Sequence, residues 1–180
     1  MSGFFRIGGR KLKLKKLDSS FYTDNPHIPQ ALDYDMEAGT WSDNKIRGHG
    51  IVQVHVNGLI FAIPVRSNIS HSAAKILERN KDQAAKSKGM GLDYSKALLI
   101  RNAAHITADV FVLRSKEAGR KLVGIDDHVT KQFSSYVERY IAACRKNDRN
   151  ILNSAEYRYT TLINYHTELE LDVSRIKFRY

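Results

Sequence analysis

The stretch from residue 45 to residue 71 constrains the fold more than any other part of the chain. Two runs of strand-forming residues, 51–56 and 59–63, flank the dipeptide Asn57-Gly58. Both residues of this dipeptide readily adopt positive φ angles, so Asn-Gly favours a two-residue hairpin turn. The sequence therefore predicts a β-hairpin with an apolar body.

Polar and basic side chains gather at the open end of this hairpin. Pro64 has no backbone N–H, so we expect the strand pairing to end or to reach an edge there. The polar residues on either side of the two strands are Lys45, Arg47, His49, Arg66, Ser67, Asn68 and His71. Because the entry and the exit of a hairpin lie side by side, Arg47 is expected opposite Ser67 and its neighbours.

The N-terminal part predicts a strand, a short helix and a long loop. Residues 11–17 alternate basic and apolar residues, as in a half-buried strand with Lys13 and Lys15 on its exposed side. A basic disordered arm is the alternative. Asp18 or Ser19 can cap a short helix, and residues 26–44 then form a long surface loop, which Tyr34 and Trp41 are expected to anchor.

The C-terminal part predicts further strands and at least one long helix. Apolar residues recur at helical spacing over 126–147, with acidic residues at the start and basic residues at the end. The weaker predictions are helices over 70–87 and 150–165, strands over 97–100 and 109–113, and an added strand within 169–180. Together these patterns indicate an α+β fold in which five or six mostly antiparallel strands pack against helices.

The charge points to a polyanionic partner. Lys and Arg number 29 against 19 Asp and Glu, so the net charge is +10 and the pI is near 9.7. Such a balance favours nucleic acid first and an anionic membrane surface second, while a basic protein without such a partner is the alternative.

Length and composition indicate one folded domain over residues 1–180, with residues 1–10 as a flexible start. The hydrophobic fraction of 42% suits a folded protein, and no apolar run is long enough to span a bilayer. The N-terminus lacks the apolar core of a signal peptide. Cys144 is the single cysteine, which excludes an internal disulfide and suits a reducing cytoplasm.

Familiar catalytic motifs are missing from the sequence. There is no HExxH, Walker loop, GxGxxG or GxSxG, so no metal or cofactor is expected. What remains is a basic surface with a hydroxyl, imidazoles and lysines near strand ends, a set that suits metal-independent RNA cleavage. In that reaction the RNA supplies its own 2′-hydroxyl as the nucleophile, and the protein supplies proton transfer and cations for the phosphorane.

Each candidate residue also has a plainer explanation. Ser67 could bind a phosphate oxygen. It could also be a polar residue at a strand end whose hydroxyl hydrogen-bonds to the backbone, and spacing alone favours this second explanation. Arg47 and Arg66 could clamp phosphate, although exposed arginines are common. His71 could shuttle protons, although a lone histidine is more often structural. Tyr94 could stack a base or lie in the core, and Lys96 could bind phosphate or be simply solvated.

Two segments resemble a known family. They are residues 47–52 with Asn57-Gly58 and 61–68 (RGHGIV, NG and FAIPVRSN), and residues 91–97 (GLDYSKA). Together they look like the toxins of type III toxin–antitoxin systems, most closely the TenpN branch, with ToxN and AbiQ toxins as more distant relatives. The resemblance covers roughly residues 11–147.

The resemblance implies a metal-independent endoribonuclease with a compact, partly open, mostly antiparallel β-barrel like those of MazF- and Kid-type toxins. Such a toxin cuts cellular or phage RNA to leave 2′,3′-cyclic phosphate and 5′-hydroxyl ends. A repeated pseudoknot antitoxin RNA holds it inactive, often in a closed protein–RNA ring. The expected setting is the bacterial cytoplasm, without a membrane, and the expected outcomes are growth arrest and abortive infection.

The family's site residues transfer to several positions of this chain. Ser67 matches an essential hydroxyl, and Arg66 stands where ToxN-like proteins have a threonine. Lys45 and Arg47 compete for the position of a lysine before the first hairpin strand. Tyr22 matches an aromatic residue near the cleft. Asn68 and His71 occupy the neighbourhood of a lysine that this chain lacks, and Lys96 is a candidate to replace its charge.

Overall fold

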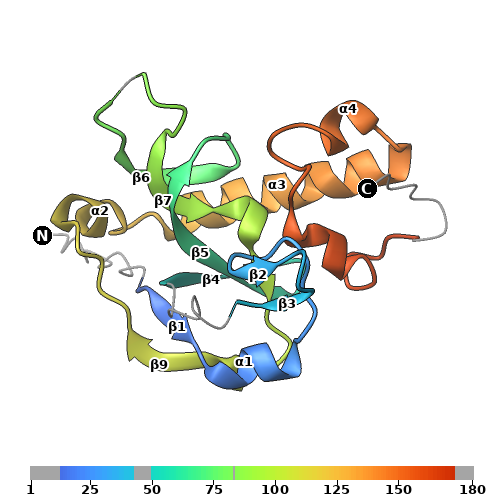
Figure 1. Ribbon diagram of the computed structural model, residues 1–180, viewed down its shortest axis with the longest axis horizontal. Coiled ribbons are helices and arrows are strands. Elements are labelled where there is room, and N and C mark those ends of the chain that lie inside the picture. Colours follow the sequence, from blue (N-terminus) through green and yellow to red (C-terminus); the bar gives the residue numbers. More distant parts are fainter. Residues whose placement is uncertain (1–12, 43–49, 83, 173–180) are drawn as a thin grey trace, which may run out of the picture.

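The computed structural model describes residues 13–42, 50–82 and 84–172. Its main sheet has the strand order β6-β7-β5-β4-β1-β9, with the short β8 paired to β5 (Figure 1). The strands of this sheet are β1 (Lys15–Leu17), β4 (Ile51–Val56), β5 (Leu59–Ile69), β6 (Ala74–Arg79), β7 (Gly89–Asp93), β8 (Leu98–Leu99) and β9 (Ile106–Val110). Every pairing in it is antiparallel, which confirms the predicted fold class. The two outer strands, β6 and β9, do not pair, so the described strands form no closed barrel.

Helices and a small hairpin surround this sheet. The α-helices are α1 (Ser19–Asp24), α2 (Lys116–Lys121), α3 (Asp126–Lys146) and α4 (Arg149–Leu152), and the 3-10 helices are η1 (Tyr94–Lys96), η2 (Ala103–His105) and η3 (Thr161–Tyr165). A separate two-stranded sheet joins β2 (Tyr34–Asp35) to β3 (Thr40–Trp41). No helix in the described part of the chain combines the length and the apolar character needed to cross a membrane.

The predicted central hairpin is confirmed. Asn57 and Gly58 have φ angles of 51° and 75°, as a two-residue hairpin turn requires. β4 and β5 then pair from Val56–Leu59 to Ile51–Pro64. Pro64 is the last β5 residue in that register, but β5 itself continues to Ile69 by pairing with β7 instead. The hairpin therefore has an outer extension, which carries Arg66 and Ser67.

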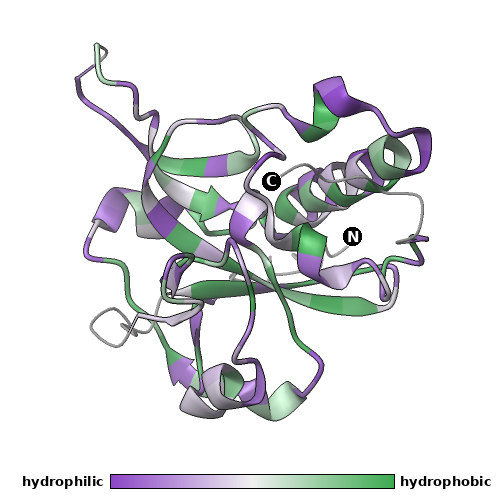
Figure 2. Cartoon of the chain, turned by 45° about the vertical axis from the view of Figure 1, so that its right-hand side comes forward, coloured by the Kyte–Doolittle hydropathy of each residue, from purple (hydrophilic) through white to green (hydrophobic). Residues whose placement is uncertain are grey.

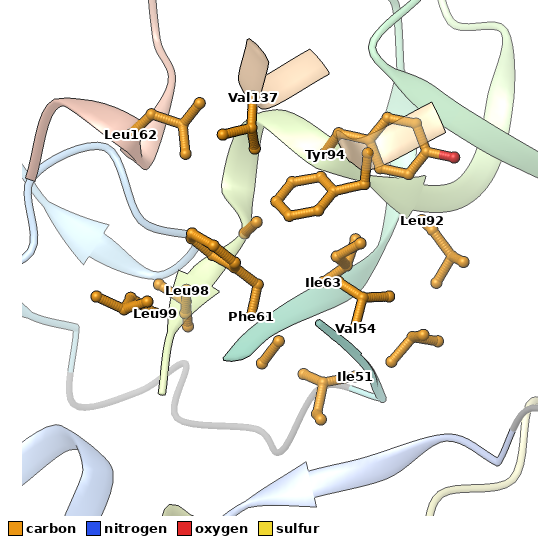
Figure 3. Packing of buried hydrophobic residues seen from close by; sticks show 14 of the residues in the cluster. Ile51, Val54, Phe61, Ile63, Leu92, Tyr94, Leu98, Leu99, Val137 and Leu162 are labelled. Atoms are coloured by element: carbon orange, nitrogen blue, oxygen red, sulfur yellow. The ribbon is translucent and has the colours of Figure 1, made fainter. Parts of the chain in front are cut away.

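The long helix α3 packs its apolar face on this hairpin. Phe133 of α3 contacts Phe61 of β5 with a ring-centroid distance of 5.2 Å. Val129, Phe133 and Val137 are fully buried, and Figure 3 shows Val137 above the core side chains of the sheet. Cys144 lies buried on the same helix, as predicted. Burial of this face stabilises the helix more than its intrinsic propensity does.

The helix predicted over 70–87 is wrong. This segment forms β6 and a largely hydrophilic connection to β7 (Figure 2). Two glycines of β7 explain the difference, because a Cβ on Gly89 or Gly91 would lie 2.0 Å or 2.1 Å from a carbonyl oxygen of β6. The close approach of β7 selects a strand over the helical preference of the alanines.

Other predictions need smaller corrections. The strand predicted over 109–113 is β9, which begins and ends three residues earlier. The helix predicted over 150–165 is reduced to α4, a run of turns and η3. The long loop contains the β2–β3 hairpin, although Trp41 does anchor it, with Nε1 donating a hydrogen bond to the carbonyl of Asn25. Residues 169–172 form no strand, and the rest of the predicted C-terminal strand lies outside the described residues.

Candidate functional site

Four side chains meet where β5, β7 and η1 converge, and we call them the Asp93 cluster: Arg66, His71, Asp93 and Ser95. The carboxylate of Asp93 is 0% exposed. Its Oδ2 accepts a hydrogen bond from Arg66 Nη1 at 2.9 Å, and its Oδ1 accepts one from Ser95 Oγ at 2.7 Å. His71 Nε2 lies 3.3 Å from both Asp93 Oδ1 and Ser95 Oγ.

The local backbone explains why these groups meet. Asp93 is the N-cap of η1, and its Oδ1 also accepts the backbone N–H of Ser95 at 3.0 Å. Arg66 pairs with Gly91 across the sheet. Residues two apart on a strand share a face, so Asp93 is on the same face as Gly91, which has no side chain to stand between them. The Asp-x-Ser spacing thus builds a local cap and an acceptor for a distant arginine.

Hydrogen bonds keep the buried Asp93 ionised. Burial alone would raise the pKa of Asp93, but hydrogen bonds from His71, Ser95 and Arg66 together hold it below its ordinary value. The side chain of Arg66 remains 34% exposed, and one of its nitrogens binds Asp93. A guanidinium has five N–H donors, and those that form no hydrogen bond with the described residues can bind an anion from solvent. The cluster therefore presents a fixed cation at the surface.

Ser67 and Asn68 follow Arg66 but do not join the cluster. Both residues are exposed, and the alternation of side chains along a strand directs Ser67 to the other side of β5 from Arg66. Asn68 has a φ angle of 58°, and the β5–β7 register shifts between Arg66 and Ile69. This bulge is of the kind that redirects side chains at a strand end. Arg66 and Ser67 are thus adjacent at the surface without a direct contact.

The structure gives His71 a different role from the predicted proton shuttle. Its side chain is only 10% exposed, and Nε2 faces Asp93 and Ser95. Its Nδ1 is buried without a hydrogen-bond partner among the described residues. A ring held in this way positions the carboxylate and presents no nitrogen to a substrate.

Lys96 ties three segments together. Its Nζ donates hydrogen bonds of 2.8 Å to the carbonyls of Gln30 and Tyr159. Burial lowers the pKa of Lys96 to about 8, an effect that Asp93 opposes and Arg66 reinforces. The amine of Lys96 is therefore bound to two backbone carbonyls, and it is not the open phosphate-binding cation that was one of the two expectations.

Tyr94 is a core residue, which is the second of the two alternatives that the sequence left open. The ring is buried beside Phe133, and Figure 3 shows it among the core side chains with its hydroxyl directed away from them. That hydroxyl donates a hydrogen bond of 2.8 Å to Gln132 Oε1. Burial also raises the pKa of Tyr94.

The remaining predicted residues lie elsewhere. Tyr22 of α1 is half-buried against Trp41, with ring centroids 5.0 Å apart, and burial raises its pKa to about 12. Lys13 is exposed, and Lys15 lies on β1, which is separated from β7 by β4 and β5. Figure 1 shows α1, β1 and β9 at the opposite end of the molecule from β6 and β7. Lys45 and Arg47 lie outside the described residues.

A second histidine–carboxylate pair occupies that opposite end. His105 Nε2 lies 2.8 Å from Asp24 Oδ2, so η2 is joined to the end of α1. Here the imidazole is 5% exposed and the carboxylate 55% exposed. The His105 ring packs edge-on against Phe21. This pair connects two elements and holds no cation at the surface.

Sequence reasoning placed Asp93 and Ser95 in a family-like string but gave neither a role. The usable signal was the Asp-x-Ser spacing just after a strand, which is typical of a side chain that caps the following turn. The described residues contain no group of three or more His, Cys, Asp or Glu side chains placed to hold a metal ion.

Comparisons with known proteins returned no match among family models, curated proteins or solved structures. The features of this chain that bear on function are therefore the chemistry of the site and the resemblance of the two motif segments. That chemistry consists of a fixed surface arginine, an exposed serine next to it and a strongly basic chain.

Proposed function

We propose that this chain is a metal-independent endoribonuclease whose site is the outer end of β5. The observation that carries the proposal is the buried Asp93, which holds the guanidinium of Arg66 at the surface directly before the exposed Ser67. An arginine fixed by a buried carboxylate keeps its charge and its orientation, and this is what recognition of a phosphate requires. The net charge of +10 supports RNA as the source of that phosphate.

In the proposed reaction the 2′-oxygen of a ribose attacks the adjacent phosphorus, and the bond from phosphorus to the 5′-oxygen breaks. One proton leaves the 2′-hydroxyl and one is taken up by the departing 5′-oxygen, so the products are a 2′,3′-cyclic phosphate and a 5′-hydroxyl. Arg66 stabilises the additional negative charge on the phosphorane, and Ser67 donates a hydrogen bond to a phosphate oxygen. His71 and Asp93 act as positioning residues behind Arg66.

The proposal extends to the biological setting that the two motif segments suggest. The chain would be the toxin of a type III toxin–antitoxin system in the bacterial cytoplasm. A repeated pseudoknot RNA would inhibit it within a closed protein–RNA assembly, and cellular or phage RNA would be its target. A partly open barrel of the MazF and Kid type belongs to the same proposal; the antiparallel strand order supports it, whereas the unpaired outer strands do not.

The test is induced expression in bacteria followed by mapping of RNA 5′-hydroxyl ends. We expect wild type to arrest growth and to create new sequence-specific ends, and we expect Ser67→Ala and Arg66→Lys to do neither. Loss of one well-placed transition-state donor typically costs about a hundredfold or more in rate. Ser70→Ala is the matched control, because Ser70 is also an exposed serine, just past the end of β5.

Cleavage assays with purified protein are the decisive part of this test. Wild type and Ser70→Ala should cut RNA in the presence of EDTA, whereas Ser67→Ala should leave it intact. Intact RNA with every variant, or equal cutting by wild type, Ser67→Ala and Arg66→Lys, would contradict the assigned site.

A specific observation also supports a second candidate, an RNA-binding protein without nuclease activity. The imidazole of His71 is shielded from solvent, so the cluster binds a phosphate more readily than it transfers a proton. Under this candidate, Arg66→Lys lowers the affinity for RNA and reduces its salt dependence, while Ser67→Ala changes neither.

A further inference from the structure

A pocket of about 520 Å³ opens beside the Asp93 cluster, between α3 and the start of β6. Two of its lining residues directly follow cluster residues in the chain, since Ser72 follows His71 and Tyr94 follows Asp93. The charge of His71 also acts on Glu156, another lining residue. A strand of RNA that crosses Arg66 would therefore have this pocket within reach.

The rim of the pocket carries unpaired positive charge. Lys131 and Arg139 are exposed on α3, and neither forms an ion pair with another described residue. Eight residues separate them, which is about 12 Å along the helix axis, so their long side chains can reach phosphates on either side of one bound group. The carboxylate in the lining, that of Glu156, accepts a hydrogen bond from Ser72 Oγ.

The floor of the pocket is aromatic. Tyr136 and Tyr157 stack on each other with their centroids 4.6 Å apart, and both are buried, so they line the pocket with ring edges and not with open faces. Ala73 lies in the same lining. Above this floor, Gln132 uses Oε1 to accept the Tyr94 hydroxyl, so its amide N–H groups remain available. Ser135 adds a hydroxyl one helical turn further along. Aromatic side chains with polar groups beside them are typical of sites for small-molecule ligands, and the volume is within their usual range.

We infer that this pocket binds one nucleotide of single-stranded RNA, with the base against the edges of Tyr136 and Tyr157 and its phosphates on Lys131 and Arg139. The statement that this nucleotide neighbours the scissile phosphate rests on the proposed function. Gln132 and Ser135 are placed to contact the edge of the base, so the pocket would select which nucleotide lies next to the cut. Arg66 would hold the reacting phosphate, and the pocket would determine which phosphate of the RNA strand lies on Arg66.

Nucleotide binding tests the pocket without any need for cleavage. We would titrate the full-length protein with 5′-AMP, 5′-GMP, 5′-CMP and 5′-UMP by calorimetry, with adenosine and inorganic phosphate as separate probes. We expect at least one nucleotide to bind more tightly than either adenosine or phosphate. Replacement of Lys131 and Arg139 together by alanine should weaken that binding about tenfold or more. The matched control is Lys146→Ala, which removes an exposed cation from the last turn of the same helix and should bind normally.

The outcomes separate this inference from the proposed nuclease. Nucleotide binding that the double variant loses, and that Lys146→Ala retains, would support the pocket even if RNA stayed intact. Absence of nucleotide binding, equal binding by the double variant, or equal binding of inorganic phosphate would overturn it. If RNA is cut, the double variant should raise KM with little change in kcat, and Gln132→Ala should alter the sequence at the new 5′-ends. Loss of kcat with unchanged KM would contradict a role in substrate binding.

Discussion

The two ends of the main sheet each hold a histidine–carboxylate pair, and the pairs are built in opposite ways. At the β5–β7 end the carboxylate of Asp93 is fully buried and Arg66 lies outside it. At the α1–β9 end the imidazole of His105 is buried, and Asp24 faces the solvent. A buried anion has to be compensated by donors and therefore fixes a cation at the surface, whereas an exposed anion shares its charge with water. The first pair can therefore prepare a site, whereas the second only joins two elements.

Breaking the buried anion should have the largest effect. Asp93→Asn keeps the shape of the side chain but removes the charge that compensates Arg66, so we expect a loss of about 3 kcal/mol in the free energy of unfolding. Chemical denaturation at pH 7 measures this loss, and RNA affinity should fall with it. An unchanged midpoint would mean that Arg66 does not depend on Asp93.

The same variant gives a pH test with a defined sign. Burial opposes ionisation of Asp93, but its hydrogen bonds lower its pKa below the unfolded value, so its stabilising contribution is present above about pH 4. That contribution is lost as the pH falls through the pKa of the folded state. Wild type should therefore lose more stability than Asp93→Asn as the pH falls below about 4. Parallel curves for the two proteins would contradict this assignment.

Lys96 should give the β5–β7 end a pH-dependent contribution to stability in the alkaline range. Burial lowers its folded pKa to about 8, below the unfolded value, so the unfolded chain binds more protons between those two values. Stability should rise by roughly 1–2 kcal/mol between about pH 8 and pH 10. Lys96→Met should abolish this rise, as denaturation curves across that range would show. A rise that persists in the variant would assign it to another group.

Loss of one donor to the buried anion should have a smaller effect. Ser95→Ala removes the 2.7 Å hydrogen bond to Asp93 Oδ1, while the backbone N–H of Ser95 and the side chain of Arg66 still donate. We expect a loss of about 1 kcal/mol in thermal or chemical unfolding. A loss as large as that of Asp93→Asn would mean that the serine, and not the arginine, compensates the charge.

The exposed anion should matter least. Asp24→Asn alters a carboxylate that is 55% exposed, so we expect a loss of about 0.5 kcal/mol or less and no change in RNA affinity. This variant also serves as the control for Asp93→Asn, since both remove one carboxylate beside a histidine. Equal effects of the two substitutions on stability would remove the contrast between the two ends.

Local patterns predicted some elements well. Asn57-Gly58 specified its turn through backbone preference alone, and the apolar spacing of 126–147 specified α3, because both signals depend only on neighbouring residues. The strand β6 could not be predicted from neighbouring residues. Its strand conformation depends on two glycines of β7, which let the partner backbone approach, and nothing within β6 itself signals that approach.

The candidate site also contains features that local sequence predicted and features that depend on contacts between distant residues. Arg66 and His71 were found because they belong to a polar run at a strand end, but their joint contact with Asp93 depends on the β5–β7 pairing. The sequence left Tyr94 between a base-stacking and a core position, and Lys96 between a phosphate-binding and a solvated one, because sequence shows residue type and not burial. Both are held inward by partners far along the chain, Gln132 for the first and Tyr159 for the second.

The two-residue turn between β4 and β5 also bears on the order in which the molecule folds. The contacts of this hairpin are local, and β7 joins it from the next part of the chain, whereas the register of β1 and β9 joins Lys15 to Val110 across more than half of the sequence. Contacts between distant residues lose more chain entropy on closing and so form later. We therefore expect the β5–β7 end to assemble early and the α1–β9 end to close last. A chain still growing on the ribosome would then complete its arginine–carboxylate pair before it had paired the outermost strand of its sheet.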